Sequence, residues 1–590
     1  MPPFFYQHFW TLVGDCVTKT VLDFPNHDII PPNFNETHVV LIPKIKNPKK
    51  ITQYRPISLT NVISCLASKV LANRLRLFLP QIISENQNVF MSDRLITDNV
   101  LVAYETMHHI NQKRSGKVGE MALKLDMRKA FDRVEWGCLE KIMYKMGFHE
   151  SWVKLVMRCV STVTYSIKIN GRPRGHITPF RGLRQGDPLS PFLFLFCAEG
   201  LATLIRKSVE FGLLNGVATC LRGPKISHLF FVDDSLIFCK ANIEECSTLE
   251  ENLDTYECST GQQLNREKTS LFFSWNTPQE IQEAIKNCFG ADIIRQHEAY
   301  LGLPSLVGRS NCNTFQALKE KLNNKLPRWK EKLLSHADKE ILIKAVAQVI
   351  PTYTMSIFQL PNALCDELTS MVRSFWWGQN NGKNKITWSS WDKICVPKTK
   401  GGLGFHDLKA FNLTLLAKQG WRLQTNTSSL VHQVFKAQYF LERDFISAEM
   451  GTKPSYAWRS IMVAQQVVQH GYRWQVGNKN SIKIWADKWL PTCSTFRVTI
   501  HPHALHLESH VSSLIDHDTG NWRIDLIKEI FLPHDAQAIL SIPLSIRRPL
   551  DRMVWAFTPK GQFTVNFTYK VALSLSQATT SSLGSTSNNQ

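Results

Sequence analysis

Two acidic motifs could hold metal ions and carry chemistry. Asp126 directly follows an apolar run (121–125) with the length and composition of a buried strand. Asp233 and Asp234 stand between two apolar, β-prone runs, which predicts a β-hairpin with the acid pair at its tip. Adjacent carboxylates repel one another. A divalent cation that prefers oxygen ligands, such as Mg²⁺, would offset this repulsion.

Each acidic motif alone is a weak signal. An aspartate at the end of a strand is commonly a turn or capping residue, and an Asp-Asp turn commonly does no more than contact solvent. Together, one acid from a strand end and two from a hairpin supply the minimum ligand set for two metal ions about 4 Å apart, as in in-line phosphoryl transfer. The conjunction therefore indicates phosphoryl-transfer chemistry.

Strand and helix signals alternate around these acids. From Thr37 to about Phe273, strand-like runs alternate with amphipathic helices, which predicts an α+β region. After Asp126, the apolar residues from Phe131 onward broadly fit one face of a helix that closes at Gly147, a C-cap residue. Asp126 therefore falls where a strand ends and a helix soon begins, a usual position for ligand-binding carboxylates in α/β sheets.

The composition excludes several classes of protein. The chain has 590 residues, 43% of them hydrophobic, which excludes wholesale disorder and a small disulfide scaffold. No apolar run approaches the ~20 residues of a membrane-spanning helix, and no secretory signal is visible. The 14 cysteines include no CxxC pair, which favours reduced thiols in an intracellular protein.

The charge indicates a polyanionic partner. Lysine and arginine number 69 against 49 acidic residues, so the net charge is +20, and the pI is near 9.3. Such a balance favours nucleic acid over a membrane surface as the partner. On its own it says nothing about catalysis.

Nine ordered motifs then carry a family resemblance. The chain resembles the reverse transcriptase of non-LTR (LINE-type) retrotransposons, in particular that of plant elements. The matching blocks are LIPKIKNP (41–48), YRPISLTN (54–61), KVLANRL (69–75), QNVFMSDRLITDN (87–99), KLDMRKAFDRVEW (124–136), RGLRQGDPLSP (181–191), FVDD (231–234), GQQLNREKT (261–269) and YLGLP (300–304). A single FxDD motif would be a poor signal, whereas nine blocks in the family's order are a strong one.

The resemblance implies the catalytic residues. Asp126 and Asp233 look like the principal metal ligands, and Asp234 would complete the acidic pair. The implied cofactor is two Mg²⁺ ions, with Mn²⁺ as a possible substitute. Phe131 would lie beneath the incoming sugar as a steric gate against a ribose 2′-hydroxyl. Its other interpretation is a first core anchor of the following helix, and both roles are compatible.

The resemblance also implies a nucleotide pocket. Gln185 and Gly186 would belong to the pocket for nucleotide and template, although a loop entering a helix is the simpler interpretation of that block alone. The residues implied to meet the triphosphate are Lys44, Arg55 and Lys69. Lys268 would protonate the departing pyrophosphate. For any one of these lysines, an ordinary surface position is the commoner explanation.

The fold class expected is α+β, a right-hand polymerase with fingers, palm and thumb and a mainly helical, tryptophan-rich C-terminal extension. Most of the tryptophans between 376 and 500 are expected in cores rather than on base-stacking surfaces. The regions expected are an N-terminal helical lead-in (1–35), fingers and palm (36–305), a thumb-like helical region (306–375), a tryptophan-rich region (376–545), a partial zinc-binding-type domain (546–575) and a disordered tail (576–590).

Several features depart from the family's pattern. Valine replaces the usual alanine at Val232, where a β-branched residue suits a strand, and Asp93 replaces the usual glycine before Arg94. The chain begins just ahead of the polymerase, so we expect no N-terminal endonuclease. A histidine cluster includes His506 and His510, whose i,i+4 spacing could share a metal on a helix, but we interpret it as a solvated loop and predict no zinc.

The function predicted is that of an RNA-directed DNA polymerase. Its expected partners are an RNA template, a DNA primer and deoxynucleoside triphosphates, with no membrane, in a nuclear or cytoplasmic ribonucleoprotein. One alternative is a catalytically inactive, retrotransposon-derived remnant that binds nucleic acid, which the departures favour and the intact acids oppose. A metal-dependent nuclease fits the acids but not the ordered blocks before them.

Overall fold

The structure is a computed structural model that divides into two compact units, unit 1 (Met1–Leu306) and unit 2 (Val307–Gln590). The division falls one residue from the 305/306 boundary between the predicted palm and thumb. The described residues are 1–27, 33–91, 94–232, 234–294, 299–308, 314–330, 334–378, 386–477, 481–491, 495–499, 506, 508–516, 519–545, 547 and 549–585. Asp93 and Asp233 lie outside them.

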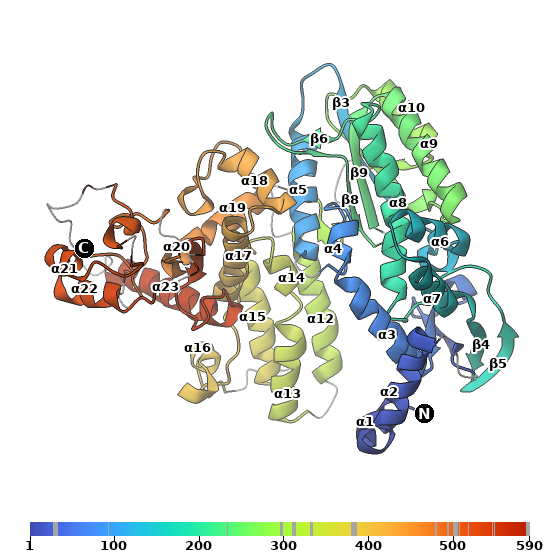
Figure 1. Ribbon diagram of the computed structural model, residues 1–590, viewed down its shortest axis with the longest axis horizontal. Coiled ribbons are helices and arrows are strands. Elements are labelled where there is room, and N and C mark those ends of the chain that lie inside the picture. The colour runs from blue at the N-terminus through green and yellow to red at the C-terminus, as the bar shows by residue number, and fades with distance from the viewer. Residues whose placement is uncertain are drawn as a thin grey trace. The chain divides into compact units, whose positions relative to one another are not determined.

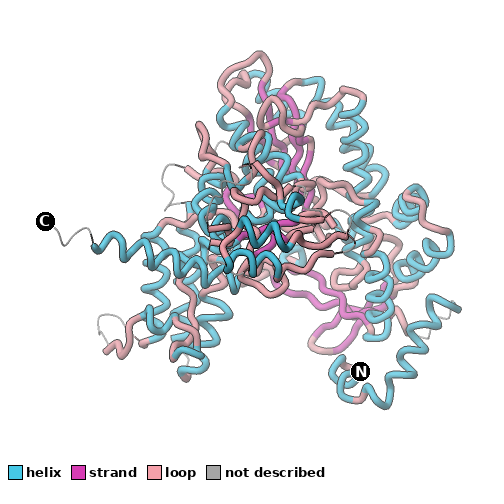
Figure 2. Tube along the Cα trace, turned by 60° about the vertical axis from the view of Figure 1, so that its left-hand side comes forward, coloured by secondary structure: helices cyan, strands magenta, loops and turns pink. Residues whose placement is uncertain are grey.

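Unit 1 combines helices with two larger sheets and two two-stranded sheets, β6-β7 and β12-β13 (Figures 1 and 2). Its helices are α1 (Pro3–His8), α2 (Trp10–His27), α3 (Val62–Arg76), α4 (Leu79–Ile82), α5 (Ile96–Gln112), α6 (Trp136–Lys145), α7 (Glu150–Ser161), α8 (Ser190–Glu210), α9 (Ile243–Thr260) and α10 (Gln279–Phe289). Its strands are β1 (Glu36–Pro43), β2 (Tyr54–Thr60), β3 (Gly119–Leu125), β4 (Thr164–Ile169), β5 (Arg172–Ile177), β6 (Val217–Ala218), β7 (Lys225–Ile226), β8 (His228–Phe231), β9 (Asp234–Ala241), β10 (Ser270–Phe273), β11 (Asp292–Ile293), β12 (Ala299–Tyr300) and β13 (Leu303–Pro304).

The five-stranded sheet has the order β11-β10-β3-β9-β8 and helices on both faces (Figure 1). Successive side chains of a strand point to opposite faces. Leu123 and Ile237 accordingly belong to the core shared with α8 and α9, whereas Ala122 and Leu236 face α5 residues such as Val100. Because both faces of the sheet are buried, the sequences of β3 and β9 are nearly continuous runs of apolar residues.

The four-stranded sheet has the order β2-β1-β4-β5. Strand β1 pairs antiparallel with β2 and parallel with β4, and β5 is the outer edge strand beyond β4. All six residues of β5 are exposed, so the β4–β5 hairpin is held mainly by its pairing with β1.

The helix predicted after Asp126 is confirmed only in its later part. Residues Ala130–Arg133, including Phe131, form a short 3₁₀ turn, and α6 begins at Trp136. Lys129, which precedes the turn, has a left-handed backbone with φ of 54°, so the chain changes direction there before the helix begins. Gly147 follows the helix with φ of 86°, as expected for a C-cap glycine.

The hairpin predicted around the acid pair is confirmed. Strands β8 and β9 are antiparallel, and Phe231 pairs with Asp234 across a two-residue turn. Val232 lies in that turn with φ of 58°, not in a strand as its β-branched side chain predicts. A left-handed backbone is unfavourable for any residue with a Cβ and most unfavourable for a β-branched one. The departure from the family's alanine therefore adds strain to the turn.

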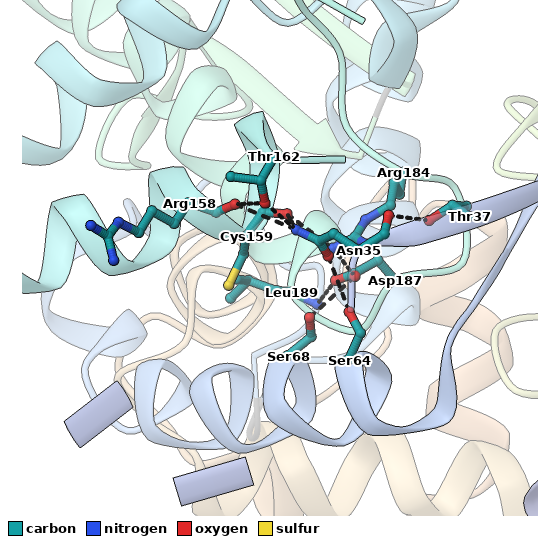
Figure 3. Close-up of polar contacts among 10 residues, drawn as sticks. All are labelled: Asn35, Thr37, Ser64, Ser68, Arg158, Cys159, Thr162, Arg184, Asp187 and Leu189. Carbon is teal, nitrogen blue, oxygen red and sulfur yellow. Dashed lines mark hydrogen bonds and ion pairs between the residues drawn. The ribbon is translucent and has the colours of Figure 1, made fainter. Parts of the chain in front are cut away.

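A buried polar network fixes the loop that carries the RQG motif (Figure 3). Arg184 and Asp187 form an ion pair of 2.7 Å whose side chains are only 5% and 2% exposed. Arg184 also donates to the Asn35 side-chain oxygen (2.9 Å) and to the Cys159 carbonyl (3.1 Å). Asp187 accepts from the Ser68 hydroxyl (3.2 Å) and from its own loop, at the backbone N–H two residues later (2.8 Å).

Asn35 is the second centre of this network. Its side-chain oxygen accepts from Ser64 of α3 at 3.1 Å as well as from Arg184. Its amide nitrogen donates to the Thr162 hydroxyl at 2.7 Å and to the Cys159 carbonyl of α7 at 3.2 Å. The network thus joins the start of β1, two helices and the loop, and satisfies the charges that burial would otherwise penalise.

Unit 2 is mainly helical, with one two-stranded sheet. Its elements are α12 (Gln316–Lys330), α13 (His336–Leu342), a π-helical turn (Ile343–Ala347), α14 (Thr352–Met355), α15 (Asn362–Trp376), α16 (Trp391–Cys395), α17 (Leu408–Thr425), α18 (Leu430–Tyr439), α19 (Tyr456–Val463), α20 (Gln465–Gly471), β14 (Tyr472–Gln475), α21 (Ile524–Ile530), α22 (Pro533–Leu540), β15 (Arg552–Trp555) and α23 (Val565–Ser585).

Helix α17 is the centre of unit 2. It packs against α14, α15, α18, α19, α20 and α23 and is buried around most of its circumference. Its buried Asn412 donates to the carbonyls of Met355 (2.8 Å) and Phe358 (3.0 Å) and accepts from the Leu360 N–H (2.8 Å). These hydrogen bonds satisfy backbone C=O and N–H groups between α14 and α15 that have no partner within a helix.

The region 546–575 shares the core of unit 2. Strand β15 pairs with β14, and α23 packs on α17 and α20. Helix α23 also extends to Ser585, whereas the sequence predicts a disordered tail from residue 576. A helix nucleated on a packed segment adds further residues at little cost, which explains this extension. Residues 586–590 lie outside the described residues.

The tryptophans of region 376–500 are mostly in cores, as predicted. Five of the nine are buried, and Trp388 is 82% exposed. His506 and His510 do not share a helix, so the i,i+4 spacing has no structural meaning there. No helix within the described ranges is long and apolar enough to cross a membrane.

We predict that Asp187→Ala lowers the free energy of unfolding of unit 1 by about 3–5 kcal/mol, because it leaves the buried Arg184 guanidinium without its counter-charge. Urea denaturation of the full chain, followed by hydrogen exchange of unit 1 amides, measures this loss. Glu150→Ala breaks the exposed Lys154–Glu150 pair and serves as the control. An Asp187→Ala loss no larger than the control's would contradict the assigned role of the network.

We predict that Val232→Gly is more stable than Val232→Ala by about 1 kcal/mol, because glycine accepts a positive φ without steric cost. Both variants remove the valine methyl groups, so the loss of packing is shared and the difference reports the backbone. Urea denaturation of the two variants gives this difference. In an ordinary strand alanine is the more stable residue, so that order would show that the turn is not left-handed.

Candidate active site

The pairing of β3 with β9 positions two of the three predicted acids. The register ends with Leu125 opposite Ser235. Asp126 is the next residue beyond Leu125, and Asp234 is the residue before Ser235. Because the strands are antiparallel, both aspartates lie at the same end of the same strand pair. Asp233 lies outside the described residues.

The block 261–269 holds Asp126 in place. The Asn265 backbone N–H donates to the Asp126 carbonyl (2.8 Å), and its side-chain amide donates to the Asp126 carboxylate (3.0 Å). The ammonium of Lys268 lies 3.5 Å from the same carboxylate oxygen. Two blocks that are about 140 residues apart in sequence therefore form one site. The Asp126 side chain is 26% exposed, so solvent and ligands reach it.

A cleft of about 1050 Å³ opens beside Asp126. Its lining comes from β1, β2, the segment 126–133, β4, β5, the loop 184–186 and the block with Asn265. The predicted site residues in this lining are Lys44, Arg55, Asp126, Phe131, Gln185, Gly186 and Lys268. Lys69 lies on the exposed side of α3 and is not among the described residues that line the cleft. Sequence blocks scattered over more than 200 residues thus converge on one concave surface.

Phe131 has the contacts of a fixed ring rather than a mobile one. It lines the cleft, and its ring stacks on that of Phe194 of α8 with a centroid distance of 4.9 Å and an angle of 16°. Phe194 is buried, so the core of unit 1 supports the Phe131 ring from behind. A ring supported in this way resists displacement by a ligand group that meets its other face.

The loop with Gln185 and Gly186 is docked on β2. The Ser58 N–H donates to the Gln185 carbonyl at 2.9 Å. Gly186 has φ of 114°, and a Cβ there would lie 3.1 Å from the Ser58 carbonyl oxygen. Both the backbone conformation and the close approach favour glycine at this position. The structure therefore explains why glycine occupies position 186, independently of the predicted place of this residue in the nucleotide pocket.

Asp132 is a cleft residue that the sequence reasoning missed. Its carboxylate accepts from the Gln185 side-chain amide at 3.2 Å. Burial raises the pKa of Asp132, although Lys129, Gln185 and Lys44 act in the opposite direction. Only its place beside Phe131 in the AFD triplet could have indicated it.

Several cations also line the cleft without having been predicted. They come from the turn after Asp126 and from the loop with the RQG motif, and they are Arg128, Lys129, Arg133 and Arg184. Arg184 serves the buried network, whereas the other three follow β3 directly. A phosphate-bearing ligand in this cleft would meet positive charge from two sides, from the 128–133 turn and from Lys44 and Arg55.

The donor set of the site fits a hard divalent cation. Asp126 and Asp234 supply carboxylate oxygens, which Mg²⁺ prefers. The Lys268 ammonium beside Asp126 shows that this carboxylate stabilises a positive charge. Among the described residues no group of three His, Cys, Asp or Glu side chains could hold a metal ion, and the third acid, Asp233, is not one of them.

The comparisons with known proteins identify the family. Residues 43–304 match the family model described as "Reverse transcriptase (RNA-dependent DNA polymerase)". An uncharacterized mitochondrial protein of Arabidopsis thaliana is 39% identical over 142 residues, which cover 24% of this chain and 92% of that protein. The Pol polyprotein of an R2 retrotransposable element of Popillia japonica is 26% identical over 209 residues, 35% of this chain and 28% of the polyprotein.

A putative ribonuclease H protein of Arabidopsis thaliana is 29% identical over 273 residues, 46% of this chain and 44% of that protein. The chain thus spans less than half the length of this relative. Members of the matched family generally use divalent metal ions, and the mixed helix-and-sheet structure with a matched reverse transcriptase region has the fold class of a right-hand polymerase. The chain belongs to the plant-type reverse transcriptases of non-LTR retrotransposons.

Proposed function

We propose that this chain is an RNA-directed DNA polymerase that extends a primer 3′-hydroxyl with deoxynucleotides. The observation that carries the proposal is the β3–β9 register, which brings Asp126 and Asp234 to one end of a strand pair. The cleft beside Asp126 has the cations and the supported aromatic ring that a nucleotide site needs. The partners proposed are an RNA template, a DNA primer and deoxynucleoside triphosphates.

In the proposed reaction the primer 3′-oxygen attacks the α-phosphorus of the incoming nucleotide. A new P–O bond forms to the primer, the bond to the β-phosphate breaks, and pyrophosphate leaves while the 3′-hydroxyl loses its proton. We propose that Asp126, Asp233 and Asp234 hold two Mg²⁺ ions, which Mn²⁺ could replace. When bound, such ions stabilise the charge that develops on the attacking and leaving oxygens.

The chain's own residues orient the nucleotide. Lys44 and Arg55 line the cleft and are proposed to bind the triphosphate, where ammonium and guanidinium groups form charge-assisted hydrogen bonds. Lys268 is proposed to donate a proton toward the departing pyrophosphate, which its place 3.5 Å from Asp126 supports. Two hydrogen bonds position Gln185: its side-chain amide donates to the Asp132 carboxylate, and its backbone carbonyl accepts from the Ser58 N–H of β2. Catalysis of this kind rests mostly on positioning and electrostatics.

A second candidate function is a nucleic-acid-binding remnant without polymerase activity. The strained turn at Val232, next to Asp233, is the observation that favours it. The proposal of an active enzyme rests on the acids and the cleft, which retain the residues that the chemistry needs. Primer extension on a primed RNA template with Mg²⁺ and labelled deoxynucleotides separates the two candidates, because only the polymerase yields longer primers.

We predict that Asp126→Asn, and likewise Asp233→Asn, lowers primer extension by at least roughly 10²–10³-fold, the size of losing one preorganised electrostatic contact. Binding of the primed RNA template should remain, because the amide is isosteric with the carboxylate. Filter binding and extension assays measure both quantities. Asp254→Asn changes an exposed carboxylate of α9 and serves as the control. Extension at the wild-type rate by Asp126→Asn would refute the proposed metal ligand.

We predict that Phe131→Ala admits ribonucleotides, with a loss of sugar discrimination of roughly 10- to 200-fold, because the ring no longer meets the 2′-hydroxyl. The measured quantity is the ratio of kcat/KM for deoxynucleotides and ribonucleotides. Phe192→Ala removes another partly buried ring of unit 1 that does not line the cleft and controls for loss of packing. Unchanged discrimination in an extending Phe131→Ala enzyme would reject the steric gate.

A further inference from the structure

The segment 164–186 has an unusual charge. It contains five lysine and arginine residues and no aspartate or glutamate. Two of the five are used within the structure, since Arg184 pairs with Asp187 and Arg181 pairs with Glu135 at 3.1 Å. The other three are Lys168, Arg172 and Arg174 of the β4–β5 hairpin. An ordinary solvated surface usually mixes both signs of charge.

Two of these three cations belong to β5, the outer strand of the four-stranded sheet (Figure 1). Arg172 and Arg174 belong to β5, in which all residues are exposed, and no described acidic side chain forms an ion pair with either guanidinium. Large apolar side chains are exposed in the same segment, namely Ile169 (55%), Ile177 (46%) and Phe180 (76%). Exposed cations interleaved with exposed apolar and aromatic groups are typical of single-stranded nucleic-acid surfaces.

The strand register places the two arginines on the cleft side of the hairpin. Ile167 pairs with Arg174, and Ile169 pairs with Arg172. Residues that pair directly point to the same face, and Ile167 and Ile177 line the cleft. The register of the hairpin shifts between Tyr165 and Ile167. Because of this shift, Arg172 and Arg174 lie on the same face as Ile177, and Pro173 lies on the opposite face. The surface of the cleft therefore continues along the hairpin as two cations about 7 Å apart along β5.

We infer that this face of the β4–β5 hairpin binds the phosphate backbone of the single-stranded RNA template that has not yet been copied. The identity of this strand rests on the proposed function, because the hairpin extends the cleft in which the template would be read. Arg172 and Arg174 contact phosphates, and Phe180, whose ring lies 5.3 Å from the Arg181 guanidinium, offers a stacking face for a base.

A protein strand that pairs with the open edge of β5 is a poorer occupant. Pro173 lies within β5 and has no backbone N–H, and a proline on an edge strand opposes the addition of another strand. The positive charge of the hairpin also selects for a polyanion. A phosphate backbone is the better occupant, because it binds to the cations of the hairpin and does not need hydrogen bonds to the open edge of β5.

Template overhang provides the test. A DNA primer is annealed to RNA templates that leave either a single unpaired 5′ nucleotide or an overhang of roughly 15 nucleotides, within the range of single-strand site sizes. Binding is measured without nucleotides in the Asp126→Asn background over a series of salt concentrations. For the long overhang, Arg172→Ala/Arg174→Ala should weaken binding and reduce the slope of log K against log salt by about 1.4, two single-strand phosphate contacts. For the short overhang the affinity should not change.

The control removes two exposed cations from another hairpin of unit 1. Arg222→Ala/Lys225→Ala acts on the β6–β7 hairpin and should leave both affinities unchanged. An unchanged long-overhang affinity in Arg172→Ala/Arg174→Ala, an equal loss on both templates, or an equal loss in the control would each overturn the inference. Failure of the polymerase proposal appears separately, as absence of extension by the wild-type chain on the short-overhang template, which does not need the hairpin.

Discussion

The cleft of unit 1 depends on one buried ion pair, Arg184 with Asp187. Burying two charges is costly unless each has hydrogen-bond partners, and here Asn35, Ser68 and the Cys159 carbonyl supply them. Those partners come from the start of β1, from α3 and from α7. One pair therefore holds the loop with Gln185 and Gly186 against β2, and this contact closes one wall of the cleft.

The end of the five-stranded sheet that carries Asp126 and Asp234 depends on the register of β3 and β9. Successive side chains of a strand point to opposite faces of the sheet. A slip of one residue between β3 and β9 would therefore place Asp126 and Asp234 out of register, and it would also move the apolar side chains of the slipped strand from one face of the sheet to the other. Because both faces of β3 and β9 are apolar, the fit of individual side chains on each face, rather than an alternation of polarity, favours the register that unites the two acids. The same packing that stabilises the sheet thus positions the chemistry.

The sequence predicts the local parts of the site well. The strand before Asp126, the hairpin around Asp234 and seven cleft residues follow from patterns within short blocks, either through their own periodicity or through the family resemblance. Contacts between distant segments could not be predicted. Arg184 and Asn35 are 149 residues apart, and Asp132 meets Gln185 only because the loop docks on β2. Val232 and Phe131 were assigned to the wrong elements, because turn geometry outweighed β and helical propensity there.

Helix α17 has a consequence for the order in which unit 2 acquires its structure during synthesis. It ends at Thr425, but the segments that cover it include α23, which begins at Val565. A ribosome needs roughly 10–30 s to add the intervening residues at typical elongation rates. Throughout that interval Trp421 and its neighbours, which pack on Trp555 and Phe563, lack their cover. The nascent chain must therefore shield an aromatic surface, by transient contacts or by a chaperone, until β15 and α23 emerge.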